Sequence, residues 1–246
     1  HGIFCGQVLT TKENFGSRRH YLNQKNCMNE MLAHNVIPIV NENDTISVTE
    51  LMFTDNDELS GLIATMMGME ALIILSNIDG IYNGNPEDKN SQVIETVEAN
   101  KNLSQYIQTN KSSFGRGGML TKTTIARKVA DEGIHVFIAN GKKDNILLDL
   151  VNKEKHVICT QFIANRKEVS SVKKWIAHSD GFAKGEVHVN AGARKALTGN
   201  KATSVLFIGI TKILSEFEKD DIVKIIDENG KQLGVGKTQY DNKKAT

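Results

Sequence analysis

The chain has 246 residues, of which 39% are hydrophobic, 24% are charged and 6% are aromatic. This length is enough for one or two domains with a substantial core, and the composition excludes a collagen-like, disordered or membrane-spanning chain. Thirty Lys and Arg against 29 Asp and Glu leave a net charge of +1. No overall field therefore attracts nucleic acid or an anionic membrane, and any charged site must be local.

The cysteines and histidines bear on the compartment and on metal binding. Cys5, Cys27 and Cys159 are odd in number and widely spaced, which favours a reducing compartment over a disulfide framework. The residues that follow His1 show neither the basic segment nor the apolar run of a signal peptide. The seven histidines have no metal-ligand spacing such as H-x-x-x-H. We therefore expect a cytoplasmic protein without a protein-ligated transition metal.

Along the first part of the chain, apolar residues with helical spacing are followed three times by a short apolar run. The first two helices are expected to begin near Ser17 and Asp55, and the third runs through Thr123 to Ala130. The strands are expected to cover residues 36–40, 71–75 and 134–138. A helix followed by a buried strand, repeated in this way, predicts an α/β fold with a mainly parallel sheet covered on both faces.

The pattern changes near residue 165. Residues 186–190 alternate in polarity, residues 204–208 resemble a strand, and the run 221–226 leads into the turn 228–230. Residues 165–246 carry 15 Lys and Arg against 10 Asp and Glu, a net charge of +5, which leaves −4 for residues 1–164. We expect a first α/β domain over residues 1–164 and a small β-rich domain over residues 165–246.

Two polar segments are candidates for a binding site, because ligands of open α/β sheets bind beyond the carboxyl ends of strands. Asn41-Glu42-Asn43-Asp44 follows the first apolar run, and Thr54-Asp55-Asn56-Asp57-Glu58 opens the next helix. Taken separately, an Asx-rich turn and ordinary helix capping explain them. Taken together, their carboxamides and carboxylates could receive one polar ligand, such as an amino acid or a hydrated metal.

A glycine-rich segment, residues 113–118, leads into the third helix and places Lys122 about one turn inside it. Backbone N–H groups of such a loop can bind phosphate oxygens, and the helix N-terminus and the lysine add positive potential. The segment fits neither the P-loop nor the Rossmann pattern, and a flexible surface loop is the alternative. The segment 76–82, after the second run, suits a nucleotide base or ribose, although by itself it is only a turn.

In combination and in this order, I-V-N-E-N-D at 39–44, D-N-D at 55–57 and G-G-M-L-T-K at 117–122 resemble the amino acid kinase family. Residues 75–82 are similar to the adenine-side loop of that family. Residues 165–176 and then 185–193 resemble the junction to a PUA domain and its first strand. The resemblance spans nearly the whole chain and implies a three-layer α/β fold with a mainly parallel sheet, followed by a small PUA domain.

Within the family, the resemblance is to kinases that use ATP to phosphorylate the side-chain carboxylate of L-glutamate. The product is L-glutamyl 5-phosphate, and the reaction is the first step of L-proline synthesis. The resemblance further implies Mg²⁺ as a cofactor, L-proline as a feedback inhibitor, and assembly into a homo-oligomer. This chemistry agrees with the polar and glycine-rich segments, since phosphoryl transfer depends on positioning and on stabilisation of charge by Lys and Mg²⁺.

Site residues are transferred motif by motif. Asp44 and Asn56 would bind glutamate, with Asn41 and Asp55 beside them. Asp57 would orient the lysines around the phosphates, and Lys122 would neutralise the charge on the transferred group. The residues implied to hold the nucleotide are Ser76, Asn77, Arg116, Gly117, Gly118, Met119, Leu120, Thr121 and Lys122.

The chain departs from the family pattern at both ends. The family begins with a strand and a glycine-rich loop that carry a second catalytic lysine, followed by another substrate loop, and none of these has a counterpart here. We therefore expect the site in this chain to be incomplete. The PUA domain is expected to stop early, near residues 240–246.

Two other functions compete with this interpretation. Another carboxylate kinase of the same fold, such as an acetylglutamate kinase, would lack the PUA domain. RNA binding would use the PUA domain and its charge of +5, but its basic clusters at 173–174, 194–195 and 243–244 are only pairs. Phosphate binding needs clustered Lys and Arg, so RNA binding is not favoured, and no membrane partner is expected.

Overall fold

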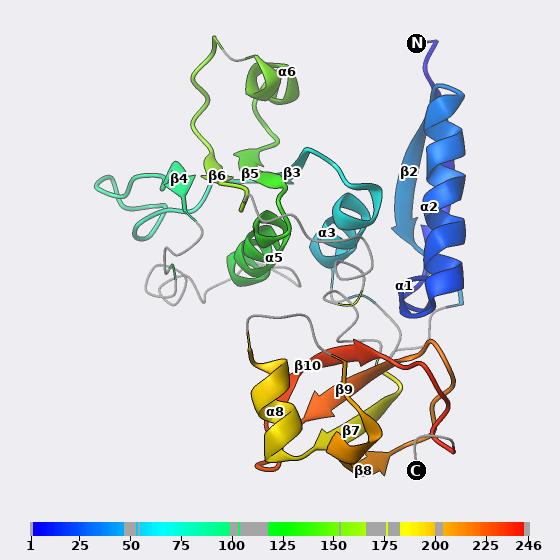
Figure 1. The fold of residues 1–246 in the computed structure, drawn as a ribbon. Helices are drawn as coiled ribbons and strands as arrows, with labels where there is room; N and C mark the ends of the chain where they lie inside the picture. The colour runs from blue at the N-terminus through cyan, green and yellow to red at the C-terminus, as the bar shows by residue number, and fades with distance from the viewer. Residues whose placement is uncertain are drawn as a thin grey trace. The chain divides into compact units, whose positions relative to one another are not determined.

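The computed structural model describes residues 2–46, 53, 55–98, 103, 118–152, 154–165, 176, 183–199 and 204–243, and its elements are drawn in Figure 1. The chain divides into two compact units, one of His1–Met52 with Ser170–Thr246 and one of Phe53–Val169. Within the described ranges, no helix has the length and apolarity needed to cross a membrane.

The first unit begins with two parallel strands joined by helices. The elements are β1 (Phe4–Thr10), α1 (Glu13–Gly16), α2 (Arg18–Ala33) and β2 (Val36–Glu42). Figure 1 shows α2 lying along β2. Ser17 is the N-cap residue of α2, as predicted, although its side chain makes no capping hydrogen bond. The polar residues and glycine of β1 gave no apolar run, so this strand was not predicted.

The second unit contains a four-stranded sheet in the order β3-β5-β6-β4. Its elements are α3 (Asn56–Met67), β3 (Ala71–Ser76), β4 (Thr96–Val97), α5 (Met119–Asp131), β5 (His135–Asn140), α6 (Ile146–Val151) and β6 (Thr160–Phe162). The pairs β3–β5 and β4–β6 are parallel, whereas β5–β6 is antiparallel. The predicted second and third helix–strand repeats are confirmed, and the sheet is mainly parallel.

Helices α3 and α5 pack beside each other and against the sheet. Each helix immediately precedes the strand it covers, so both N-termini lie at the edge where β3 and β5 end. Gly68, in the left-handed region with φ 67°, ends α3 as predicted. The core between helices and sheet contains Ala126, Val136 and Ile138, all of which are fully buried. This core holds the two helix N-termini at the edge of the sheet where ligands bind in open α/β folds.

The remaining part of the first unit is the small β-rich domain. It comprises β7 (Gly185–Val189), α8 (Ala191–Leu197), the 3-10 helix η4 (Phe207–Gly209), β8 (Ile210–Leu214), β9 (Ile222–Ile226) and β10 (Gln232–Lys237). The sheet order is β10-β9-β7-β8, with β7 and β9 parallel. The turn before β10 contains Gly230 at φ 79°, and the predicted hairpin is confirmed.

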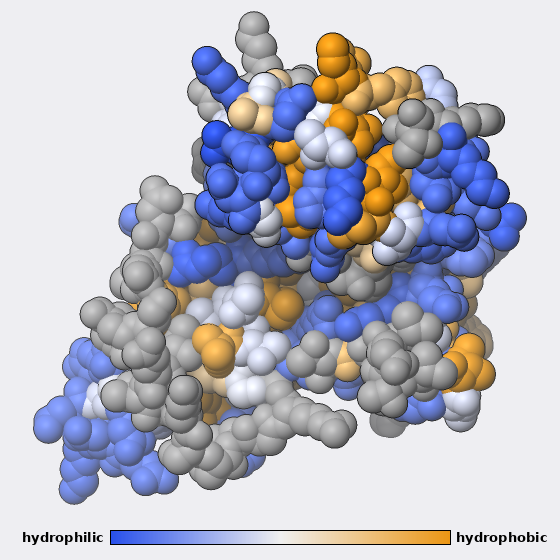
Figure 2. All heavy atoms as spheres, turned by 90° about the horizontal axis from the view of Figure 1, so that it is seen from below, coloured by the Kyte–Doolittle hydropathy of each residue, from blue (hydrophilic) through white to orange (hydrophobic). Residues whose placement is uncertain are grey.

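The prediction of a strand over residues 204–208 is wrong. Phe207–Gly209 form the 3-10 helix, and the strand starts only at Ile210. The start of α8 binds this segment instead, because the Asn190 side chain donates to the Ile208 carbonyl at 3.0 Å and the Asn190 N–H donates to the Gly209 carbonyl at 2.9 Å. The side chains of residues 206–208 are exposed, and Figure 2 shows hydrophobic residues reaching the surface between hydrophilic ones.

A buried hydrogen bond ties the loop after β3 to β6. The Thr160 hydroxyl, with no exposed surface, accepts from the Ile81 N–H at 2.8 Å. Gly80 allows this approach, since a Cβ there would lie 2.5 Å from Thr160 Oγ1. The loop that carries Ser76 and Asn77 is therefore anchored at its far end.

Replacing Thr160 by valine should release this anchor, because valine keeps the volume but leaves the Ile81 N–H without an acceptor. We expect a loss of about 1–3 kcal/mol in the free energy of unfolding of the second unit, and faster hydrogen exchange at the Ile81 amide. Thr160→Ser keeps the hydroxyl and should preserve that protection. Equal protection of Ile81 in Thr160→Val and in the wild type would contradict the prediction.

Candidate active site

The N-terminus of α3 is acidic and caps itself. Asp55 is its N-cap, and Asp55 Oδ1 accepts from the Glu58 N–H at 3.0 Å. Asp57 and Glu58 lie in the first turn, where carboxylates are stabilised by the helix dipole. The second oxygen of Asp55, Oδ2, is buried and has no hydrogen-bond partner within the described ranges. Because an unpaired buried carboxylate oxygen is costly, this atom is suited to receive a donor from a ligand.

The N-terminus of α5 has the opposite character. Its N-cap is Gly118, which has no side chain to cap the helix, and the first turn contains no acidic residue. The N–H groups of Thr121 and Lys122 bond to the Gly118 carbonyl at 2.9 and 3.2 Å. The preceding amides, of Met119 and Leu120, have no acceptor within the helix. This end of α5 therefore presents backbone donors and positive potential, which favour an anion.

An ion pair joins the two helix ends. Lys122 Nζ donates to Asp57 Oδ2, and the side chains of Lys122 and Asp57 are only 18% and 15% exposed. A lysine in the first turn is unfavourable to its own helix, because the N-terminus already carries a partial positive charge. Asp57 offsets that repulsion and holds the ammonium group at the edge of the sheet. The structure thus brings together the two residues predicted to be catalytic.

The loops after β3 and β5 meet at the same edge. Ser76 is the last residue of β3 and Asn77 follows it, at the strand end where they were predicted. Ser76 Oγ lies 3.4 Å from Asn77 Oδ1. Further along the first loop, Asp79 Oδ1 accepts from Asn140 Nδ2 at 2.9 Å and pairs with Lys143 Nζ at 2.8 Å. Sequence reasoning missed Asn140, the last residue of β5, and Lys143, three residues after it. Their position at the end of a strand is a signal that could have identified them.

Burial and the neighbouring donors shift the pKa of Asp79 in opposite directions. Burial alone raises the pKa of its carboxyl group, but the hydrogen bonds from Lys143 and Asn140 outweigh burial, and the pKa lies below its ordinary value. Burial, followed by the negative charge of Asp79, raises the pKa of Tyr82. Asp79 is therefore held as a carboxylate within the loop predicted to bind the nucleotide.

Two of the other predicted substrate residues, Asn41 and Asp44, belong to the first unit. Asn41 and Asp44 are exposed at the end of β2, where the Asn43 N–H donates to the Thr10 carbonyl at 2.8 Å. Convergence of this loop with Asp55–Asp57 stays a prediction, because the two segments lie in different units. Asn56 is exposed at the start of α3. Arg116 and Gly117 fall outside the described residues.

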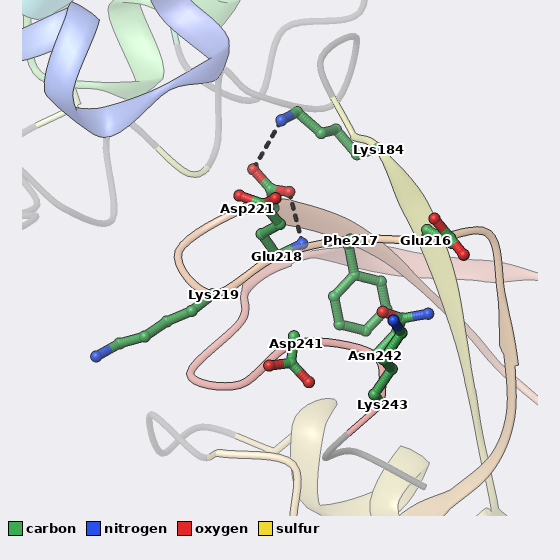
Figure 3. A pocket seen from close by; sticks show the side chains of 9 residues that line it. All are labelled: Lys184, Glu216, Phe217, Glu218, Lys219, Asp221, Asp241, Asn242 and Lys243. Carbon is green, nitrogen blue, oxygen red and sulfur yellow. Dashed lines mark hydrogen bonds and ion pairs between the residues drawn. The ribbon is translucent and has the colours of Figure 1, made fainter.

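The β-rich domain contains a cavity of about 620 Å³, drawn in Figure 3. It is lined by Lys184, Glu216, Phe217, Glu218, Lys219, Asp221, Asp241, Asn242 and Lys243. Two of its charges bind each other, since Lys184 Nζ lies 3.0 Å from Asp221 Oδ1, and Asp221 Oδ2 accepts from the Glu218 N–H at 2.8 Å. None of the predicted site residues lines this cavity. Across the described parts of the chain, no group of three or more His, Cys, Asp or Glu residues is arranged to hold a metal ion.

Each of the two parts of the chain matches the model of a known protein family or domain. The model of the amino acid kinase family matches residues 1–140, and the model of the PUA domain matches residues 185–246. The chain belongs to the amino acid kinase family. The matches lie within the two predicted domains, whose boundary at residue 165 stays a prediction.

Three relatives specify the branch of the family. Glutamate 5-kinase of Bacteroides thetaiotaomicron is 69% identical over 245 residues, which cover 100% of this chain and 68% of the relative. Glutamate 5-kinase of Chlorobaculum tepidum is 48% identical, and the match covers 100% of this chain and 67% of the relative. Glutamate 5-kinase of Thermoanaerobacter sp. is 37% identical, and the match covers 98% of this chain and 64% of the relative. The chain is thus a member of the glutamate 5-kinases and spans about two thirds of the length of these relatives.

Two solved structures are similar to parts of the chain. UMP kinase from Ureaplasma parvum is 16% identical with a TM-score of 0.39, over 56% of this chain and 50% of that one. A PUA domain from Aeropyrum pernix K1 is 26% identical with a TM-score of 0.24, over 26% of this chain and 35% of that one.

Proposed function

We propose that this protein transfers the terminal phosphoryl group of ATP to the side-chain carboxylate of L-glutamate, as the first step of L-proline synthesis. A carboxylate oxygen attacks the γ-phosphorus, the bond to the bridging oxygen breaks, and ADP leaves with L-glutamyl 5-phosphate as the other product. A glutamate side chain is ionised at neutral pH, since its ordinary pKa is about 4.3. The reaction therefore needs no general base, and the protein must chiefly bring two negatively charged reactants together.

The Asp57–Lys122 pair is the observation that carries this proposal. Lys122 and the open N-terminus of α5 supply positive charge where the phosphoryl group would pass. An ammonium group has three donors, so Lys122 can keep its bond to Asp57 and still bind a phosphate oxygen. Gly118, Met119 and Leu120 would contribute backbone N–H groups, together with the preceding Arg116 and Gly117. Thr121 would lie beside the phosphates, although its own N–H donates to the Gly118 carbonyl.

The acidic N-terminus of α3 suits the amino acid substrate. Asp55 Oδ2, which is buried without a partner in the described residues, can accept from the α-ammonium group of glutamate. Asp44 and Asn56 would bind glutamate directly, with Asn41 beside them. A ligand ammonium at this position would satisfy the second Asp55 oxygen and leave the side-chain carboxylate free to reach the phosphate.

ATP would bind with Mg²⁺ on its phosphates, and Ser76 and Asn77 would hold the nucleotide from the end of β3. Mg²⁺ is usually bound by one or two carboxylates together with substrate phosphates, and the acidic end of α3 offers carboxylates of that kind. When bound, Mg²⁺ neutralises charge on the phosphates. Asp57 would keep Lys122 oriented toward the same phosphates.

The remaining parts of the proposal concern the protein's context. Free thiols at Cys5, Cys27 and Cys159 fit a cytoplasmic enzyme, and assembly into a homo-oligomer is expected from the family resemblance. Other carboxylate kinases are less favoured because the relatives that match both domains are glutamate 5-kinases. RNA binding is not proposed, since the basic clusters of the PUA domain are only pairs. Within one of these pairs, Arg194 also bonds to Glu228 at 3.0 Å.

The substrate assignment is tested by comparing acceptors. With ATP and Mg²⁺, we expect the full-length protein to form ADP with L-glutamate and to show far lower kcat/KM with L-aspartate or N-acetyl-L-glutamate. Aspartate is one methylene too short, and N-acetylglutamate lacks the ammonium group that Asp55 would receive. A kcat/KM with L-aspartate or N-acetyl-L-glutamate comparable to that with L-glutamate would refute the assignment.

Lys122→Ala should lower kcat by about 10²–10³-fold, as the loss of a single preorganised charge-stabilising group does in other enzymes. The ATP KM should change little, because backbone N–H groups and Mg²⁺ hold the ground-state nucleotide. Lys122→Arg should restore activity only in part. Lys128→Ala, an exposed lysine on the same helix, is the matched control. A raised KM with unchanged kcat would make Lys122 a binding residue only.

Asp44→Ala should raise the glutamate KM and weaken inhibition by L-proline in parallel. We propose that proline competes with glutamate, because both ligands carry an ammonium and a carboxylate group that the same loop can bind. Steady-state kinetics at several proline concentrations would measure both effects. A variant that loses one response and keeps the other would show that proline binds elsewhere.

A further inference from the structure

Helices α3 and α5 are in close contact at Gly61. This glycine is buried in the middle of α3. A Cβ atom at this position would lie 2.8 Å from Ile125 Cγ2 and 3.1 Å from Val129 Cγ2, both on α5. Glycine in a helix interior is destabilising relative to alanine. The close contact between the helices gives a reason for its presence here.

The contact and the Asp57–Lys122 pair lie on the same face of the helix pair. Asp57 precedes Gly61 by four residues, and Lys122 precedes Ile125 by three, so each pair of positions shares a face of its helix. The two helices run parallel, because residues near the start of one meet residues near the start of the other. The separation at Gly61 therefore sets the separation of the ion pair one turn away.

The neighbours of Gly61 have little freedom to move aside. Both contacting atoms are Cγ2 methyl groups of β-branched residues, whose χ1 angle is restricted in a helix. Val129 is 1% exposed, and Ala126, between the two contacts, is fully buried. A side chain at position 61 would thus push the helices apart, rather than turn a flexible side chain.

We infer that Gly61 is a positioning residue: the absence of its side chain lets α3 and α5 approach until Asp57 can hold Lys122. The effect on catalysis rests on the proposed function, whereas the effect on Lys122 can be measured without any substrate. A shift of reacting groups by about 1 Å can cost up to 10²-fold in rate. Gly61→Ala is therefore expected to act on kcat through Lys122.

The first measurement is chemical labelling of lysines in the full chain. In the wild type, Lys122 is paired and mostly buried, whereas Lys128 on the same helix is exposed. In Gly61→Ala, the rate at which an amine-reactive reagent modifies Lys122 should rise several-fold relative to Lys128, as read by mass spectrometry. Buried Cys159 should stay protected from a thiol reagent, which excludes general unfolding as the cause.

The second measurement is steady-state kinetics with a compensating variant. Gly61→Ala should lower kcat about tenfold with little change in the ATP KM. Adding Ile125→Ala removes the methyl group at 2.8 Å, so the double variant should recover to near the activity of Ile125→Ala alone. If Gly61→Ala does not fold, the double variant Gly61→Ala/Val129→Ala is the fallback. It keeps the contact with Ile125 but removes the Val129 methyl group at 3.1 Å, so it gains space and should still expose Lys122.

The outcomes separate the two proposals. Unchanged Lys122 labelling in Gly61→Ala, or failure of Ile125→Ala to restore protection and kcat, would overturn the positioning role. Absence of glutamate phosphorylation by the wild type would overturn the proposed function, while the labelling result would still decide the role of Gly61.

Discussion

The site depends on a lysine placed where its own helix disfavours it. Lys122 lies in the first turn of α5, at the positive end of the helix dipole, and Asp57 on α3 makes that position tolerable. Removing one partner of such a partly buried pair leaves an uncompensated charge, which is costlier than losing the attraction alone. In the proposed reaction the pair would couple folding to chemistry, because the arrangement that stabilises the two helix ends would also present an ammonium group to a phosphate.

In the proposed reaction, the N-termini of α3 and α5 would bind different reactants. Asp55 and Asp57 make the start of α3 acidic, and Gly118 leaves the start of α5 open. Since both helices precede parallel strands, their starts fall at the same edge of the sheet. One edge thus offers acceptors for an ammonium group beside donors for phosphates. A zwitterionic substrate and a polyanionic one need such neighbouring and opposite environments.

The features that were predictable from the sequence are those encoded locally. The helices ending near residues 67 and 131, the strands after them, and the acidic cap at Asp55 follow from periodicity and capping chemistry. Contacts between distant segments were not predictable in this way. The prediction of a strand over 204–208 failed because Asn190, 18 residues before Ile208, hydrogen-bonds to that segment. The partners of Asp79 were likewise missed, because sequence spacing does not reveal which loops meet.

The parallel pairing of β7 with β9 has a consequence for how the β-rich domain is made. Central strand β7 is synthesised first, yet one of its two neighbours, β9, begins only at Ile222. Until that neighbour emerges, one edge of β7 has unpaired N–H and C=O groups, which are a template for pairing with other chains. Long-range pairing of this kind also slows folding. The last strands of the chain therefore protect the domain against aggregation as well as completing its sheet.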